Sequence, residues 1–120
     1  MRVAGFGFRK GATEAALRDA LMRAGGAEGV TRLATAADKA DGLRGLAGSL
    51  GLPLVAVPLG DLAGQAVLTL SPRVSALYGT GSLAEAAALA AAGPGARLIG
   101  PRAQSGDGTA TAAIAEEATP

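Results

Sequence analysis

Short apolar runs alternate with stretches of helical periodicity through most of this chain. Residues 2–8, 30–34 and 53–57 are apolar runs of strand length, and helical patterns follow the first two of them. The unbroken apolar run at 53–57 predicts a strand that is buried on both faces. Strands that alternate with helices are typical of an open, mostly parallel α/β sheet with right-handed crossovers.

Hydroxyl, acidic and glycine residues mark where the helices are expected to begin and end. Thr13 is a suitable cap for a first helix, which Gly25 ends. Asp41 is expected to cap a second helix. A Ser-Pro pair opens a short helix at 71–78, and a Ser-Leu-Ala-Glu capping box opens an alanine-rich helix at 82–92.

The C-terminal part of the chain predicts a hairpin. Residues 97–100 and 109–116 have strand patterns, and the polar turn at 104–108 joins them as an antiparallel pair. We therefore predict a single α/β domain over residues 1–120, a three-layer open sheet that is mostly parallel, with an antiparallel C-terminal hairpin at one edge. Thirty Ala and 19 Gly let helices lie close to the sheet, although each small residue buries less apolar area.

The residue types that are missing exclude several classes of function. The chain has no His, Cys or Trp, and its aromatic rings are Phe6, Phe8 and Tyr78. These absences rule out a Ser-His-Asp triad, a thiolate nucleophile, a zinc finger, an iron–sulfur cluster and a His-ligated haem. Three rings are too few for an RNA-stacking platform. We expect no metal and no cofactor, and chemistry based on carboxylate, Lys, Arg, hydroxyl or backbone amide groups.

Charge and hydropathy indicate neither nucleic acid nor membrane as a partner. Eleven basic and ten acidic residues leave a net charge of +1. The first ten residues lack the apolar core of a signal peptide, and the apolar stretches fall far short of the ~20 residues that span a bilayer. The sequence therefore predicts a cytoplasmic protein.

The predicted fold brings four segments together, because ligands of open α/β sheets bind outside the carboxyl ends of the parallel strands. These segments are residues 7–12, 35–39, 58–61 and 79–82. A rim with positive charges and hydrogen-bond donors suits an anion. Its polar side chains are Arg9, Lys10, Thr13, Lys39, Thr80 and Ser82.

The glycines near these strand ends have structural and functional interpretations. Residues 79–82 read Gly-Thr-Gly-Ser, which either lets a ligand approach the N–H groups of the next helix or simply joins two helices. Residues 5–11 have the spacing G-x-G-x-x-x-G and contain no G-K-[ST], so they match neither a dinucleotide fingerprint nor a Walker A loop. We expect Gly5 to pack a strand against a helix and Gly7 to contact a ligand.

Two charged residues also keep two interpretations, and a third has one. Lys39 lies at a strand end, where it is either a solvated surface lysine or a ligand contact. Glu85 is either the carboxylate of the capping box alone or also a ligand contact, and Asp38 is best explained as a turn residue. No pair of carboxylates has the spacing that acid–base catalysis would need.

Several of these motifs, in this order and spacing, resemble the CobE / CbiG C-terminal domain family of cobalamin biosynthesis. The resemblance covers nearly the whole chain. The family often has Val where Leu83 stands and Lys where Arg102 stands. The motifs are GFGFRKGA at 5–12, Thr35 with Lys39, LGLPL at 50–54, SPRV at 71–74, GTGSLAEAAA at 79–88 and TAAIA at 111–115.

The resemblance implies a role in making the corrin ring. Two-domain CbiG proteins of the anaerobic pathway, in which this domain follows a separate N-terminal domain, open the lactone of cobalt-precorrin-5A and release acetaldehyde. Stand-alone copies belong to the aerobic pathway as CobE. A chain of this kind is expected to bind or carry a precorrin or hydrogenobyrinic-acid-like intermediate. The alternatives are a CbiG-type hydrolase and a docking module for another corrin-biosynthesis enzyme.

Such intermediates carry acetate and propionate carboxylates around an apolar macrocycle, which a basic rim can hold by charge-assisted hydrogen bonds. Without His or Cys, the protein is expected to leave the cobalt unligated. The apolar candidates are Phe6, Phe8, Leu59 and Tyr78. The expected ligand-binding residues are Gly7, Arg9, Lys10, Lys39, Arg73, Gly79, Thr80, Gly81 and Ser82, with Arg102 as a further cation. For the hydrolase, the catalytic candidates are Lys39, Ser82 and Glu85.

Overall fold

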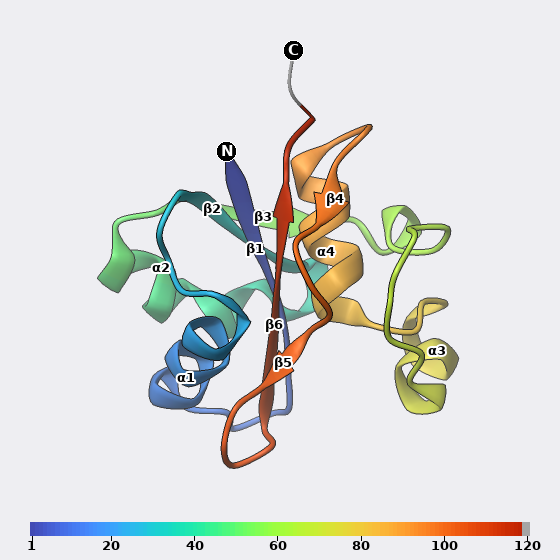
Figure 1. Cartoon of the computed structure of the whole chain (residues 1–120). Coiled ribbons are helices and arrows are strands. Elements are labelled where there is room, and N and C mark those ends of the chain that lie inside the picture. The colour runs from blue at the N-terminus through green and yellow to red at the C-terminus, as the bar shows by residue number, and fades with distance from the viewer. Residues whose placement is uncertain (119–120) are drawn as a thin grey trace.

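A six-stranded sheet forms the centre of the computed structural model, which describes residues 1–118 (Figure 1). Its strands are β1 (Arg2–Phe8), β2 (Val30–Ala36), β3 (Leu54–Val57), β4 (Arg97–Leu98), β5 (Ala103–Gln104) and β6 (Ala110–Glu116). The order in the sheet is β3-β2-β1-β6-β4, and β5 also pairs with β6. The sheet is open, as the alternation of strands and helices predicted.

The C-terminal hairpin is confirmed, and its long strand lies deep in the sheet. Strand β6 pairs antiparallel with β1 over its full length and with β4 and β5 on its other side. Strands β1, β2 and β3 are parallel, so within the described residues only β6 runs against the other strands. The strand expected at 97–100 is shorter, and pairing with β6 resumes only after Pro101, which has no N–H to donate.

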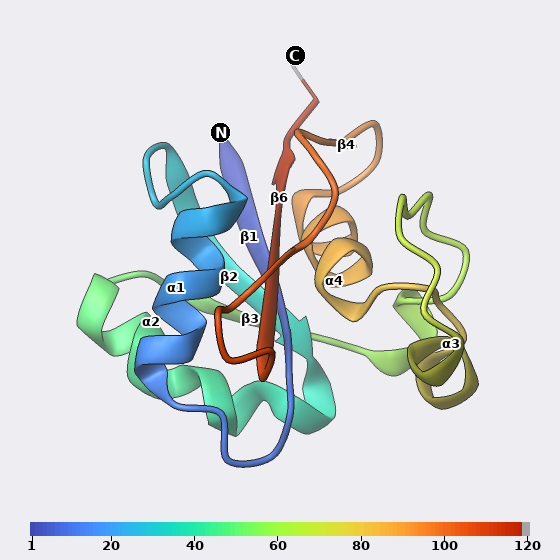
Figure 2. The same cartoon turned by 60° about the horizontal axis from the view of Figure 1, so that its bottom comes forward.

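Helices cover both faces of the sheet and form the outer two of three layers (Figure 2). Helices α1 (Glu14–Ala24) and α2 (Arg44–Leu50) lie on one face, and α4 (Leu83–Ala92) lies on the other. Helix α3 (Pro72–Tyr78) lies beyond α4, away from the sheet. Two 3-10 turns, Ala37–Leu43 and Leu59–Asp61, follow β2 and β3. None of the helices in residues 1–118 has the length and hydropathy to cross a membrane.

Three of the four predicted helix caps are confirmed. The hydroxyl groups of Thr13, Ser71 and Ser82 accept hydrogen bonds from the backbone N–H groups three residues later. The prediction for Asp41 is wrong, because this residue lies inside the 3-10 turn and α2 begins after Leu43. The Asp41 carboxylate instead accepts a hydrogen bond from Arg44 Nε at 2.8 Å.

Side chains along β1 alternate between the two faces of the sheet. Ala4 and Phe6 belong to the core beneath α1 and α2, whereas Val3 belongs to the core beneath α4. Gly5 faces α4 as well, and a Cβ there would overlap the Ala84 carbonyl oxygen and lie 2.5 Å from the Ala88 nitrogen. Helix α4 therefore crosses β1 at the close distance that only glycine permits, as expected for Gly5.

Strand β3 differs from its prediction. It lies at the edge of the sheet, where among the described residues it pairs only with β2. Val57 is buried, but Leu54 and Val55 are half-buried and Ala56 is exposed. The expectation that 53–57 is buried on both faces is therefore wrong, because an apolar run alone does not distinguish a central strand from an edge strand.

Candidate functional site

A cleft of about 190 Å³ opens at the end of the sheet where β1 terminates. One side is formed by the end of β1 and by the turn between β5 and β6, and the other side is formed by α3. Its lining residues are Gly7, Phe8, Arg9, Lys39, Ser71, Arg73, Val74, Leu77, Tyr78, Leu83, Arg102, Gln104, Gly108, Thr109 and Thr111. The position agrees with the rule that ligands bind beyond the carboxyl ends of parallel strands.

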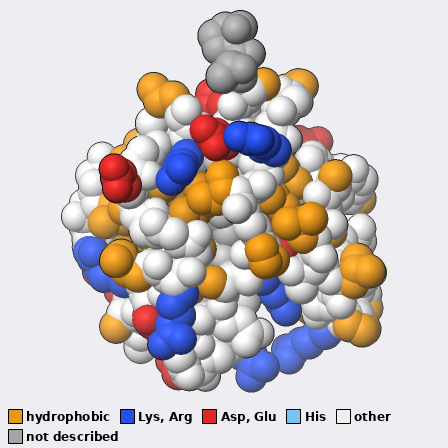
Figure 3. All heavy atoms as spheres, in the orientation of Figure 1, with side chains coloured by type: hydrophobic (Ala, Val, Ile, Leu, Met, Phe, Trp, Pro, Cys, Tyr) orange, Lys and Arg blue, Asp and Glu red, His pale blue; other side chains and the backbone are white. Residues whose placement is uncertain are grey.

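The charge of this cleft is positive. Its lining includes Arg9, Lys39, Arg73 and Arg102 and contains no Asp or Glu. Within residues 1–118, none of these four side chains takes part in an ion pair, whereas Arg18, Arg23, Arg32, Arg44 and Arg97 all do. In Figure 3, Lys and Arg side chains gather near the lower end of the molecule, towards α3. Cations that form no ion pair within the protein are available to a bound anion.

Lys39 is fixed at the base of the cleft by two contacts with Phe8. Its Nζ donates a hydrogen bond to the Phe8 carbonyl oxygen at 2.8 Å and lies 5.2 Å from the centre of the Phe8 ring. A lysine ammonium group has three donors, so further hydrogen bonds remain available to a ligand. The 3-10 turn that follows β2 places Lys39 here, which agrees with its predicted position at a strand end.

The other wall of the cleft belongs mainly to α3, which presents apolar side chains in addition to Arg73. Val74, Leu77 and Tyr78 lie at i, i+3 and i+4 on this helix, so they share one face. The Tyr78 hydroxyl donates a hydrogen bond to Asp38 Oδ2 at 3.1 Å. Partial burial, together with this hydrogen bond and the charge of Asp38, raises the pKa of Tyr78 above its ordinary value.

Glu85 is buried behind the cleft and holds the surrounding loops. Its carboxylate accepts hydrogen bonds from the backbone N–H groups of Leu68, Thr69 and Arg102 at 2.6, 2.9 and 2.7 Å. It also accepts one from the Thr69 hydroxyl at 2.7 Å. Burial raises the pKa of Glu85, but these hydrogen bonds outweigh it and the pKa lies below its ordinary value. Glu85 thereby positions the segment that carries Arg102.

Residues 79–82 do not line the cleft. Ser82 is fully buried, and its hydroxyl caps α4 by accepting from the Glu85 N–H at 3.2 Å. A Cβ on Gly81 would lie 2.8 Å from Leu70 Cα, so this glycine allows two backbone segments to meet. Thr80 is 6% exposed, and its hydroxyl oxygen has no partner within residues 1–118. In the structure this stretch joins α3 to α4 and caps α4, and its contact with a ligand stays a prediction.

Of the expected ligand-binding residues, the cleft brings together Gly7, Arg9, Lys39 and Arg73, and Arg102 joins them. Lys10 lies outside the lining. Of the apolar candidates, Phe8 and Tyr78 line the cleft, Phe6 is buried in the core beneath α1, and Leu59 lies elsewhere. Among the catalytic candidates, Lys39 alone reaches the cleft, because Ser82 and Glu85 have no solvent exposure.

The β5–β6 hairpin contributes residues to the cleft that were not predicted from the sequence. Gln104, Gly108, Thr109 and Thr111 all line it. The Thr111 hydroxyl donates to the Gly7 carbonyl oxygen at 3.1 Å, and the Arg9 N–H donates to the Thr109 carbonyl oxygen at 2.9 Å. Because β6 pairs antiparallel with β1, the start of β6 lies beside the end of β1. Predicting this pairing from the sequence would have placed these residues in the site.

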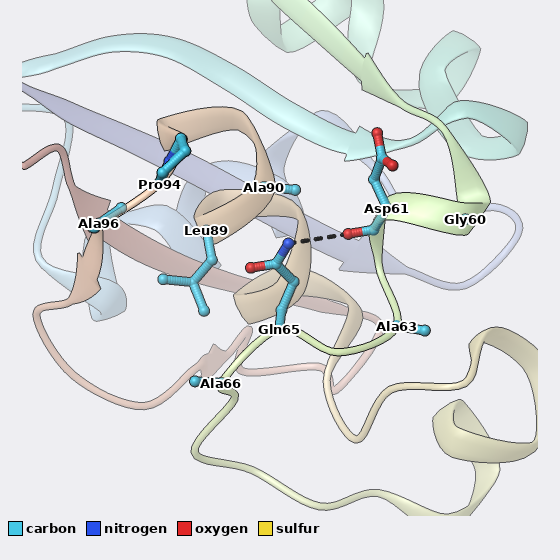
Figure 4. Close-up of a pocket in the computed structure, with 11 residues that line it drawn as sticks. Gly60, Asp61, Ala63, Gln65, Ala66, Leu89, Ala90, Pro94 and Ala96 are labelled. Carbon is cyan, nitrogen blue, oxygen red and sulfur yellow. Dashed lines mark hydrogen bonds between the residues drawn. The ribbon is translucent and has the colours of Figure 1, made fainter.

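A second, larger cavity of about 440 Å³ lies between residues 60–66 and the C-terminal end of α4 (Figure 4). It is lined by Gly60, Asp61, Gln65, Leu89 and several small residues, and by no Lys or Arg. The Gln65 amide donates to the Asp61 carbonyl oxygen at 3.1 Å. The expected convergence of 58–61 with the basic segments is therefore not seen in the cleft lining, and the charge of this cavity does not suit an anion.

The described residues contain no group of three or more acidic, His or Cys side chains placed to hold a metal ion.

Comparisons with known proteins agree on one family. The family model described as Cobalamin synthesis G C-terminus (CbiG_C) matches residues 2–115. Among solved structures, the chain is similar to CobE, a protein from the cobalamin (vitamin B12) biosynthetic pathway, with 33% identity and a TM-score of 0.86 over 100% of this chain and 92% of that chain. It is also similar to the cobalamin biosynthesis protein chiG from Agrobacterium tumefaciens str. C58, with 38% identity and a TM-score of 0.69 over 99% of this chain and 100% of that chain. No curated protein matches the chain.

Proposed function

The chain belongs to the CbiG C-terminal family and is a cobalamin biosynthesis protein, and we propose that its basic cleft binds or carries a precorrin or hydrogenobyrinic-acid-like intermediate. The observation that supports this proposal is the set of four cations, Arg9, Lys39, Arg73 and Arg102, in a cleft whose lining has no carboxylate. Intermediates of the corrin ring carry several carboxylates, each of which can accept charge-assisted hydrogen bonds from these groups.

Ligand binding in the cleft can be followed by the fluorescence of one tyrosine. Tyr78 is the single tyrosine of a chain without tryptophan, and it lines the cleft. A corrin bound there therefore changes both its own absorbance and the fluorescence of Tyr78. We propose titrating the purified protein with hydrogenobyrinic acid and following both signals.

The matched variants are Arg73→Ala, inside the cleft, and Arg44→Ala, an exposed arginine outside it. Loss of one charge-assisted hydrogen bond is expected to weaken binding about tenfold for Arg73→Ala, with no change for Arg44→Ala. Equal affinity of the two variants, or no signal change with the unmodified protein, would contradict the proposal.

The hydrolase alternative depends on Lys39, the catalytic candidate that lines the cleft. Incubation with cobalt-precorrin-5A followed by mass spectrometry tests it directly. Formation of acetaldehyde and an opened lactone, lost in Lys39→Ala while the ligand still binds, would assign chemistry to Lys39. Unchanged substrate after incubation would leave binding as the function of the cleft.

A further inference from the structure

Helix α3 leaves Leu77 exposed and buries Val74 and Tyr78 only in part. None of the residues of this helix is buried, although Val74, Leu77 and Tyr78 share a face on the cleft. Leu77 is 67% exposed, and the chain that leads into α3 also exposes Leu68 and Leu70. Figure 3 shows hydrophobic side chains on the surface at the lower right, where Figure 1 places α3. Exposed leucines concentrated in one segment indicate a contact surface.

Packing of Val74 and Tyr78 against the core beneath α4, together with a few hydrogen bonds, holds α3 to the rest of the protein. Before the helix, Glu85 binds Leu68 and Thr69, and the Ser71 N–H donates to the Gly81 carbonyl oxygen at 2.8 Å. After the helix, Gly79 turns the chain with a φ of +71°. The Tyr78–Asp38 hydrogen bond ties this end to the turn that carries Lys39. The face of α3 is thus placed across the cleft from the cations of the strand ends, with Val74 and Tyr78 half-buried against the core beneath α4 and Leu77 left exposed.

The size of the cleft indicates how a ligand would meet this face. Its volume of about 190 Å³ is below the roughly 300–1,000 Å³ of pockets that enclose small molecules. Only an edge of a broad ligand can enter, so the remainder of its body must lie against exposed surface. Three cations outside α3 and Arg73 at its start fit carboxylates at that edge, and the apolar face of α3 fits a flat hydrocarbon body.

We propose that α3 is the wall that selects for the apolar body of the ligand, with Leu77 as the main specificity-determining residue and Val74 and Tyr78 beside it. This inference rests on the proposed function, because the ligand that contacts α3 is the same carboxylate-bearing macrocycle. The cations hold the carboxylates, and α3 distinguishes a macrocycle from other polycarboxylates. Because Leu77 is exposed in the free protein, its replacement changes binding without opening the core.

The test compares Leu77→Ser with Leu59→Ser, a half-exposed leucine outside the cleft. Hydrogenobyrinic acid is titrated into each protein at NaCl concentrations from about 0.05 to 0.5 M. Leu77→Ser is expected to weaken binding about tenfold at every salt concentration, because the lost contact is apolar. Arg73→Ala is expected instead to reduce the dependence of affinity on salt. Leu59→Ser should bind as the unmodified protein does, and circular dichroism should show equal melting of both serine variants.

The outcomes separate this inference from the proposed function. If the unmodified protein binds and Leu77→Ser binds equally well, the role of α3 is wrong while the proposed function stands. If the unmodified protein does not bind hydrogenobyrinic acid, the proposed function fails and the inference fails with it. If the unmodified protein dimerises and Leu77→Ser is a monomer by light scattering, the face of α3 belongs to a second copy, which also overturns the inference.

Discussion

Glu85 accepts four hydrogen bonds from outside its own helix, and they join the loop before α3 to the segment after β4. Both carboxylate oxygens are used: Oε1 accepts two backbone N–H groups, and Oε2 accepts the Thr69 hydroxyl and the Arg102 N–H. A carboxylate can satisfy donors on both oxygens, whereas a glutamine amide presents donors of its own on one side. The charge of Glu85 therefore supports the walls of the cleft.

Glu85→Gln is expected to lower the free energy of unfolding by about 1–3 kcal/mol at neutral pH, because donors facing the new NH₂ group lose their acceptor. Urea unfolding measures this change. The matched control is Glu14→Gln, an exposed glutamate that accepts from Ser49 and pairs with Arg18. Its effect should stay within about 0.5 kcal/mol. Equal stability of the two variants would show that the Glu85 charge is not needed.

The stability of the protein is expected to fall in acid, with Glu85 as one cause. Its pKa is lower in the folded chain than the ordinary value of 4.5, so protonation favours the unfolded chain. The contribution is complete above about pH 4.5 and is lost as the pH falls through the folded pKa. Asp107 acts in the same direction, because hydrogen bonds from Ser105 and Thr109 lower its pKa from 3.8 to about 2. Urea unfolding from pH 2 to 7 should show a smaller acid loss for Glu85→Gln, and parallel pH profiles would contradict this assignment.

Gly5 gives a steric prediction with a control in the same protein. In Gly5→Ala, the new methyl group meets the backbone of α4 at Ala84 and Ala88, which cannot move aside as a side chain can. We expect a loss of about 1–3 kcal/mol or more in the free energy of unfolding. Gly48→Ala adds a methyl group in α2 with no atom within 4 Å and should be neutral or stabilising by up to about 1 kcal/mol. Similar melting temperatures for both variants would argue against the close crossing of α4 and β1.

At the scale of elements, one hydrogen bond ties the C-terminal end of α3 to the turn after β2. In Tyr78→Phe the phenol no longer donates to Asp38, so the helix loses its tie to the turn after β2. Amide hydrogen exchange in residues 72–79 is expected to become faster, while the free energy of global unfolding changes by less than about 1 kcal/mol. Unchanged exchange in this segment would mean that the contacts around Ser71 and Glu85 hold α3 by themselves.

Most elements were predictable because their signals are local. Thr13, Ser71 and Ser82 cap helices through bonds that span three residues, and a sequence displays such spacing directly. Asp41 is also a residue type that favours helix caps, but the chain forms a 3-10 turn there and the carboxylate binds Arg44 instead. The burial of β3 was not predictable, because its place at the edge depends on the order of strands in the sheet.

At the scale of the whole molecule, some residues of the candidate site were predictable from the sequence, and others were not because their position depends on the order and pairing of strands. The rule for parallel strand ends identified Gly7, Arg9 and Lys39. The resemblance added Arg73 and Arg102, both of which line the cleft. Thr109 and Thr111 were not predicted, because they join the site through pairing between strands about a hundred residues apart. Ser82 and Glu85 have residue types suited to chemistry, and their complete burial was not predictable from the sequence.

The antiparallel pairing of β6 with β1 has a consequence for how the protein is made. Every residue of β1, from Arg2 to Phe8, pairs with a residue between Ala110 and Glu116. The ribosome synthesises β1 about a hundred residues before β6, so β1 has no pairing partner on that side until β6 is made. During that interval β1 offers an open edge to other chains. We therefore expect folding to be completed only after β6 leaves the exit tunnel, with chaperones protecting the waiting edge until then.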